Sequence, residues 1–188
     1  VEAFMLFGKY DTKRHKATDS DKGRPNMSEL PQTGDGAAVA IEALDEALRQ
    51  AGFRGALDGD SALREAMSTD NSVYRICPDL VAAPCDAADM AVLVAGMHQP
   101  RFRAIALTAR GGGTGTNGQS LTDGIVVDVS RHMNQIIEID VEARRVRVQA
   151  GVVKDQLNAA LKPHGLFFAP ELSTSNRATI GGMISTDA

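Results

Sequence analysis

The sequence predicts a mixed α/β (α+β) fold. Short apolar runs of strand length alternate with stretches whose apolar residues recur at helical spacing. One such unit, Leu80–Leu107, has the pattern strand–helix–strand. It leads into Arg110-Gly-Gly-Gly-Thr-Gly-Thr-Asn-Gly118, the glycine loop, in which five of nine residues are glycine. An apolar run on each side of this loop indicates that it joins two buried strands.

The composition is that of a soluble globular protein, and the length allows one substantial core or a core with a small satellite. Of the 188 residues, 43% are hydrophobic and 23% are charged. A net charge of −4 gives no support for a nucleic-acid partner. No apolar run approaches the ~20 residues of a membrane span, and two cysteines make neither a disulfide framework nor a metal site. We expect a cytoplasmic protein without a transmembrane segment or a metal, and leave peripheral association with the inner membrane face open.

The chain divides into three parts. Residues 1–36 lack periodicity and are expected to be a disordered leader or a non-native extension, with Met27 as a candidate native start. Residues 37–75 form an N-terminal helical segment. Residues 76–188 form the main domain, which we expect to be incomplete because the sequence stops shortly after the pair Gly181-Gly182.

The first half contains two helices and three shorter elements. Ala37–Gln50 is amphipathic, with Gly52 as the C-terminal cap; Leu63–Met67 is a helical turn, and Leu80–Ala83 is a strand. A second helix begins at Asp86 as N-cap and ends before Pro100. The expected buried face of the first helix is Ala40, Leu44, Ala47, Leu48 and Ala51; that of the second is Met90, Leu93, Val94 and Met97, and Ala104–Leu107 is the next strand.

The second half is expected to contain three strands and one helix. The strands are Ile125–Val129, Ile136–Ile139 and Val146–Gln149, and the last alternates apolar and polar residues as a half-exposed strand does. Lys154–Leu161 is a short helix that Pro163-His-Gly165 ends. A long polar loop, Pro170–Thr179, follows.

The glycine loop predicts a phosphate-binding turn. Glycine adopts positive φ freely, and successive exposed main-chain N–H groups form a concavity that favours anions. Gly113-Thr-Gly-Thr-Asn-Gly118 matches the dinucleotide fingerprint G-x-G-x-x-G, but that fingerprint needs a helix after the last glycine. Gln119–Gly124 is too short for one, so a Rossmann site is rejected. A P-loop is also rejected because Gly118 is not followed by Lys.

A second polar segment, Pro170–Gly182, indicates a longer ligand than a single phosphate. It offers many hydroxyl and amide groups over a short span and ends in glycines. We expect the two segments to bind phosphate and polar ring edges together. The hydrogen-bonding side chains are Ser173, Thr174, Ser175, Asn176 and Thr179.

The order of four motifs resembles the FAD domain of the vanillyl-alcohol-oxidase and p-cresol-methylhydroxylase type. The motifs are Pro78-Asp-Leu-Val-Ala-Ala-Pro84, Arg110–Gly115, Val127-Asp-Val-Ser-Arg-His-Met-Asn134, and Ala169-Pro170 through Thr179-Ile-Gly-Gly182. The resemblance covers about residues 77–188. It implies that the glycine loop surrounds the FAD pyrophosphate, that Gly181-Gly182 lies near the pyrophosphate and flavin, and that Gly151-Val152 lies near the adenosine.

The cofactor is therefore expected to be FAD. Covalent members of the family often have histidine directly after the loop's glycines; Thr114 stands there instead, which favours non-covalent FAD. Arg110 is a candidate phosphate partner, with a cap on the preceding strand as its alternative role. Arg177 is equally consistent with a flavin or carboxylate contact and with a solvated charge. The candidate FAD-binding residues are Arg110, Gly111, Gly112, Gly113, Thr114, Gly115, Thr116, Asn117, Gly118, Gly151, Val152, Pro170, Ser173, Thr174, Ser175, Thr179, Gly181 and Gly182.

Within that family, Met67-Ser-Thr-Asp-Asn-Ser-Val-Tyr74 and Ala169–Arg177 look most like bacterial FAD/iron–sulfur D-2-hydroxyglutarate dehydrogenases. The resemblance implies oxidation of a D-2-hydroxyacid (D-2-hydroxyglutarate, D-lactate or glycolate) to the 2-oxoacid, with hydride transfer to the flavin and an unknown electron acceptor. It places the catalytic base in a cap domain and a 4Fe–4S cluster further along the chain, outside these residues. We assign no catalytic residue here.

Two other functions remain open. One is an FAD- or nucleotide-binding module without catalysis of its own. The other is a flavoenzyme like UDP-N-acetylenolpyruvoylglucosamine reductase, against which the Pro170–Arg177 loop argues. His132 and His164 are interpreted as loop histidines, and a hydrolase triad of Ser173, His164 and Asp155 is rejected because it lacks a nucleophile elbow.

Overall fold

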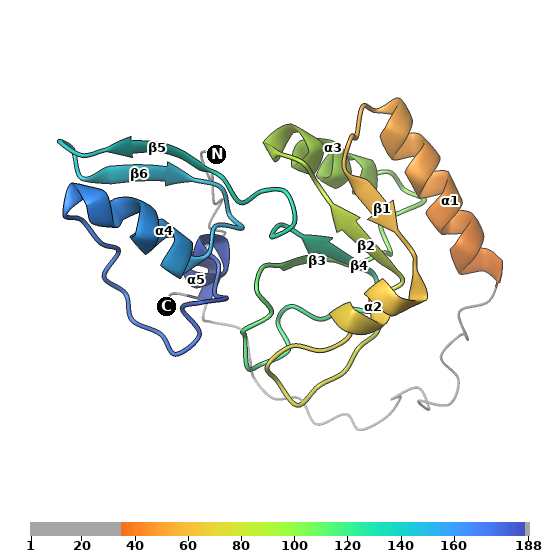
Figure 1. Cartoon of the computed structure of the whole chain (residues 1–188). Coiled ribbons are helices and arrows are strands. Elements are labelled where there is room, and N and C mark those ends of the chain that lie inside the picture. Colours follow the sequence, from red (N-terminus) through yellow and green to blue (C-terminus); the bar gives the residue numbers. More distant parts are fainter. Residues whose placement is uncertain (1–34, 187–188) are drawn as a thin grey trace, which may run out of the picture.

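The computed structural model describes residues 35–186 and consists of two lobes, shown side by side in Figure 1. The first lobe holds a four-stranded sheet with helices, and the second holds a two-stranded hairpin with helices. Each lobe has its own cluster of buried apolar side chains. The expected leader, residues 1–36, lies almost entirely outside the described residues.

The sheet of the first lobe has the order β1-β2-β4-β3. Its strands are β1 (Ala56–Asp58), β2 (Leu80–Ala83), β3 (Leu107–Arg110) and β4 (Ile125–Asp128). β4 pairs in parallel with both β2 and β3, and β1 pairs antiparallel with β2. The carboxyl ends of the three parallel strands therefore meet at one edge, which is where open α/β sheets bind their ligands.

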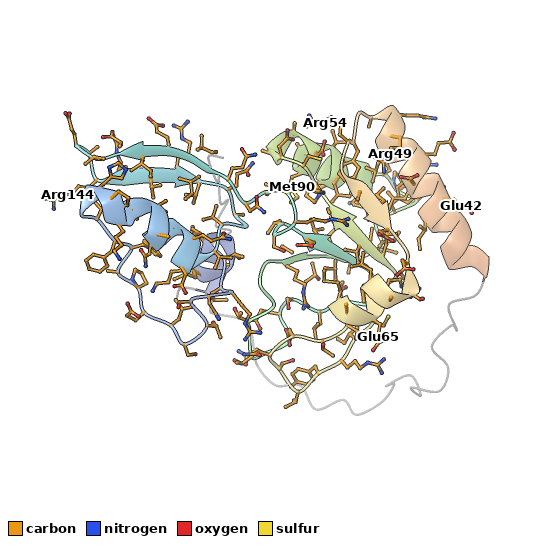
Figure 2. All side chains as sticks on the ribbon, viewed as in Figure 1. Glu42, Arg49, Arg54, Glu65, Met90 and Arg144 are labelled. Atoms are coloured by element: carbon orange, nitrogen blue, oxygen red, sulfur yellow. The ribbon has the colours of Figure 1, made fainter. Side chains whose placement is uncertain are left out.

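Three helices complete this lobe: α1 (Asp35–Gln50), α2 (Ser61–Met67) and α3 (Ala87–Met97). β2 and β4 are buried at every position, as central parallel strands usually are. Leu44 and Leu48 of α1 and Leu93 of α3 pack against one face of these strands. Arg54, beside α3 in Figure 2, donates from its main-chain N–H and its guanidinium to the buried carboxylate of Asp89.

The second lobe contains β5 (Ile136–Asp140) and β6 (Arg145–Val148), an antiparallel hairpin that packs on helices. α4 (Lys154–Leu161) continues into a 3₁₀ turn at Lys162–His164, and Gly165 ends it with φ of 67°. α5 (Ile180–Thr186) lies on the side of the lobe nearer to the first sheet (Figure 1). Val152, Leu157 and Ile180 form the centre of this lobe's core.

Most of the expected elements are confirmed, and three expectations are wrong. The strand expected at Ala104–Leu107 is a turn followed by β3, three residues later. Val94 is 42% exposed because α3 instead turns Asp89 and Gly96 into the protein. Ala51 is exposed, beyond the end of α1. β1 and α5 were not expected from the sequence.

The N-terminal helical segment and the main domain share one core. β1 pairs with β2 over three residues, and Phe53 belongs to the same buried cluster as Leu80 and Val127. The boundary near residue 75 stays a prediction. Within residues 35–186, no helix is both long and apolar enough to cross a membrane.

Candidate functional site

The glycine loop begins at the carboxyl end of β3, directly after Arg110. Its first residues have no regular structure, and Gly113 has φ of 61°, a conformation that L side chains rarely adopt. Among the described residues, the main-chain N–H groups of Gly112 through Thr116 donate to no protein acceptor. Consecutive N–H groups without partners are the feature that an anion-binding nest requires. No helix follows Gly118, as expected.

The segment before α5 lies directly against this loop. A Cβ on Gly111 would collide with the side chain of Thr179, and a Cβ on Gly112 would collide with the main-chain carbonyl of Arg177. Only glycine allows the main chains of these two segments to approach so closely. The two polar segments that the sequence singled out are therefore brought together, one from each lobe.

The turn at Gly151-Val152 joins the same region. The main-chain N–H of Ile180 donates to the carbonyl of Val152 (2.8 Å), and that of Gly181 donates to the carbonyl of Ala150 (2.8 Å). An isolated β-bridge links Val153 with Thr179. Val152 and Gly151 are buried, so these two residues position the segment before α5 from inside the protein.

Gly181-Gly182 lies in the first turn of α5, which the sequence did not predict. The Thr179 side chain accepts a hydrogen bond from the main-chain N–H of Gly182 (3.4 Å), and its carbonyl accepts one from Met183 (2.9 Å). Thr179 thus occupies the position of a helix N-cap. Its own side chain is 2% exposed and faces Gly111.

The stretch 170–175 contacts the start of α4. The carbonyl of Ser175 accepts a hydrogen bond from the main-chain N–H of Asp155 (3.2 Å). Glu171 forms an ion pair with the buried Lys154 (3.6 Å), a residue that sequence reasoning missed. Within the described residues, no hydrogen bond connects Pro170, Ser173, Thr174 or Ser175 to the glycine loop.

Arg110 binds main-chain carbonyls of the Met67–Ile76 segment. Its guanidinium donates to the carbonyls of Met67 (3.3 Å) and Thr69 (2.7 Å). Asn71 in turn donates from its main-chain N–H to the carbonyl of Gly113 (3.2 Å). The sequence motif of this segment does not reveal its contact with the glycine loop, since only tertiary structure brings together positions 43 residues apart.

The charge of Arg110 is offset by the neighbouring carboxylates of Asp70 and Asp128. Burial lowers the pKa of the Arg110 guanidinium, and the carboxylates of Asp70 and Asp128 oppose that effect. Burial tends to raise the pKa of Asp70, but hydrogen bonds from Ser72 and Ser120 and the charge of Arg110 lower it overall. Asp70 is therefore an ionised carboxylate beside a half-buried cation.

Two surface hollows lie elsewhere, beside the β5–β6 hairpin. One, of about 410 Å³, is lined by residues that include Arg144, Val146 and Phe168, with Arg144 labelled in Figure 2. The other, of about 540 Å³, includes Val148 and Ile184. Their linings mix apolar side chains with Arg144, Arg145 and Arg147, and neither includes a residue of the glycine loop. The row of main-chain N–H groups makes the glycine loop the better candidate for the phosphates.

A metal site, a disulfide and a histidine placed for catalysis are the other features to consider within residues 35–186. No group of three or more His, Cys, Asp or Glu side chains there is arranged to hold a metal ion. Cys77 and Cys85 are free thiols, and burial is the main cause that raises the pKa of Cys85. His132 is exposed in the turn after β4, as interpreted from the sequence.

Residues 78–188 match the family described as FAD binding domain, over more than half of the chain. The chain belongs to this family. The fold and family expected from the four motifs are thereby confirmed, and the matched region holds the glycine loop, the Gly151-Val152 turn and the segment before α5.

Among proteins of known function, the chain is similar to D-2-hydroxyglutarate dehydrogenases. The chain is 68% identical over 143 residues to a D-2-hydroxyglutarate dehydrogenase of Pseudomonas putida, covering 76% of this chain and 14% of the relative. It is 55% identical over 164 residues to the D-2-hydroxyglutarate dehydrogenase of Escherichia coli K12, covering 87% of this chain and 16% of the relative. Glycolate oxidase subunit GlcD of Escherichia coli K12 is more distant: it is 33% identical over 119 residues, which cover 62% of this chain and 23% of the relative. The chain thus spans only 14–16% of the dehydrogenases' length.

Solved structures support the fold. Alkyldihydroxyacetonephosphate synthase matches with a TM-score of 0.65 at 18% identity, covering 84% of this chain and 33% of that one. 6-Hydroxy-D-nicotine oxidase from Arthrobacter nicotinovorans matches with a TM-score of 0.53 at 27% identity, covering 61% and 25%. The chain therefore shares the fold of these two proteins over more than half of its length.

The residues present fit FAD. The main-chain N–H groups of Gly112–Thr116, which meet no acceptor within residues 35–186, match the acceptor oxygens of a pyrophosphate. Side chains at Gly111 or Gly112 would block the approach of the neighbouring segment. Thr114 and Thr116 add hydroxyl groups to the same loop.

Proposed function

We propose that the chain binds FAD non-covalently, as the nucleotide-binding part of a dehydrogenase that oxidises D-2-hydroxyglutarate or a related D-2-hydroxyacid. The observation that carries the proposal is the row of main-chain donors from Gly112 to Thr116, set against Arg177–Thr179 of the other lobe. The names of the relatives that are 52–68% identical support the choice of substrate.

Each segment has a proposed role. Gly112–Thr116 would hold the pyrophosphate through main-chain N–H groups, and Gly181-Gly182 would line the path toward the flavin. Thr179 keeps the two segments in register through its buried contact with Gly111. Ser173, Thr174 and Ser175 would reach polar ring edges, and Arg177, which is exposed, would lie at the rim.

When bound, the flavin supplies the redox chemistry by accepting hydride from the α-carbon of the hydroxyacid. The residues of this chain bind and orient it. Thr114 offers no imidazole at the loop, which supports a non-covalent attachment. The catalytic base, the electron acceptor and a 4Fe–4S cluster belong, in this proposal, to parts of the whole protein outside these residues.

Cofactor binding is tested on the purified chain. FAD is added, the unbound excess is removed, and the visible absorbance of the protein is recorded; the proposal expects flavin bands. Acid precipitation should then leave the flavin in the supernatant. A protein that stays colourless contradicts FAD binding, and flavin in the pellet contradicts the non-covalent attachment.

The substrate is tested on the whole protein under anaerobic conditions. D-2-hydroxyglutarate should bleach the bound flavin, and L-2-hydroxyglutarate, the matched control, should not. D-lactate and glycolate are compared at equal concentration. Bleaching by none of these acids contradicts the hydroxyacid assignment, whereas bleaching only by D-lactate or glycolate corrects the substrate and keeps the reaction class.

A further inference from the structure

The Met67–Ile76 segment forms a second wall of the glycine loop: a Cβ on Gly118 would meet Tyr74, and the Arg110 guanidinium binds the carbonyls of Met67 and Thr69. This segment closes on itself: an isolated bridge links Thr69 with Arg75, and the main-chain N–H of Ile76 donates to the carbonyl of Ser68 (2.9 Å). The guanidinium of Arg75 donates to both carboxylate oxygens of Glu65 (2.6 and 2.7 Å), the α2 residue labelled in Figure 2. The segment is thus a defined loop anchored on α2.

Four contacts fasten this segment to the glycine loop and the turn that follows it. Two are the hydrogen bonds from Arg110 to the carbonyls of Met67 and Thr69, and a third is the hydrogen bond from Asn71 to Gly113. The fourth joins Ser120, 7% exposed, whose hydroxyl donates to the carboxylate of Asp70 (2.9 Å). Together they hold the loop from its first residue to just beyond its last.

The Gly113 carbonyl has a defined direction because of these contacts. Asn71 binds that carbonyl, and a Cβ on Gly113 would lie 2.6 Å from the Arg110 guanidinium. In a peptide unit the carbonyl and the following N–H point in opposite directions. Turning the Gly113 carbonyl toward Asn71 therefore turns the N–H of Thr114 away from this wall.

We propose that Asp70, with Ser120 and Arg110, is a positioning residue that clamps the Met67–Ile76 segment onto the glycine loop and so orients its main-chain donors for phosphate. This inference rests on the proposed function for its ligand. Asp70 does not bind the phosphate; it acts through the loop. Ser72 completes its hydrogen bonds by donating from the main chain (2.8 Å).

Charge and position make opposite predictions for Asp70. A carboxylate near a phosphate site repels the phosphate, so its removal would tighten binding if charge alone mattered. Removal would weaken binding if the carboxylate holds the loop in place. Asp70→Asn separates the two effects by the sign of the change in Kd.

Binding is measured by titrating the purified protein with FAD. Asp70→Asn and Ser120→Ala should each weaken FAD binding about ten-fold or more, the loss expected when a hydrogen bond to a charged group is broken. Ser120→Thr, which keeps the hydroxyl, should bind more tightly than Ser120→Ala. Asp123→Asn is the matched control: it removes an equal charge from an exposed side chain three residues from Ser120.

Amide hydrogen exchange in the FAD-free protein tests the clamp without the ligand. The Asn71 amide should exchange about ten-fold faster in Asp70→Asn and Ser120→Ala than in the unsubstituted protein and Asp123→Asn. Unchanged exchange at Asn71, or tighter FAD binding by Asp70→Asn, would overturn the inference. If the unsubstituted protein binds no FAD, the proposed function fails, and the exchange result still decides whether the clamp exists.

Discussion

Replacing Gly112 by alanine tests the close approach of the two lobes. The added Cβ would collide with the carbonyl of Arg177 and lie 2.8 Å from its carbonyl carbon, whereas ordinary contacts begin near 3.4 Å. The obstacle is main chain and cannot rotate away. The segments must separate by about 0.6 Å to relieve the contact with the carbonyl carbon, and by more to relieve the closer contact with the oxygen. The N–H groups beside Gly112 then lose their alignment with the pyrophosphate.

The expected effect is the loss of one hydrogen bond to a charged group. Such a bond contributes about 1.5–3 kcal/mol, which is about ten- to 150-fold in Kd. FAD titration by isothermal calorimetry measures the change. Gly59→Ala is the control, because a Cβ there meets only Leu80, at 3.8 Å. An unchanged Kd in Gly112→Ala, with normal folding, would refute the reasoning.

Three further outcomes are expected. Gly113→Val should abolish FAD retention, because φ of 61° and the Arg110 guanidinium leave no room for a branched side chain; flavin absorbance of the purified variant checks this. Phe102 is 1% exposed, so Phe102→Ala should lower the free energy of unfolding, measured in urea, by about 3–5 kcal/mol. Phe167 is 72% exposed, so the control Phe167→Ala should change it by less than about 0.5 kcal/mol. Burial opposes ionisation of Asp89, but hydrogen bonds from Cys85 and Arg54 outweigh this effect and lower the pKa of Asp89. The stability that ionised Asp89 contributes is therefore present above about pH 4 and is lost as the pH falls through its pKa in the folded state. Asp89→Asn should therefore lose less stability than the unsubstituted protein on acidification below pH 4, and equal losses in urea unfolding would contradict this.

Much of the fold was predictable because local signals agreed with it. The carboxylate of Asp86 caps the start of α3 by accepting from the main-chain N–H groups of Ala88 and Asp89. The main-chain N–H of Gly52 donates to the carbonyl of Arg49 at the end of α1, so both predicted caps are confirmed. β3 was misplaced because Ala104–Leu107 is as apolar as a strand, yet its first three residues form the turn that leads out of α3. Only pairing with β4 shows that the strand continues to Arg110.

The site was predictable in its pieces more than in its contacts. The glycine loop and the Thr179–Gly182 stretch are visible in the sequence because glycine and hydroxyl residues are concentrated there. Their approach through Gly112 and Arg177 depends on how two lobes pack, which no local pattern records. Asp70 and Ser120 were missed for the same reason: 50 residues separate the two partners of their hydrogen bond.

The central claim is that main-chain donors of the glycine loop hold the pyrophosphate of FAD between the two lobes. A crystal structure of the protein with bound FAD tests it most directly. The account predicts pyrophosphate oxygens about 3 Å from at least two main-chain nitrogens of Gly112–Thr116, with Arg177–Thr179 on the other side. A pyrophosphate bound elsewhere, with those N–H groups facing solvent, would contradict the account.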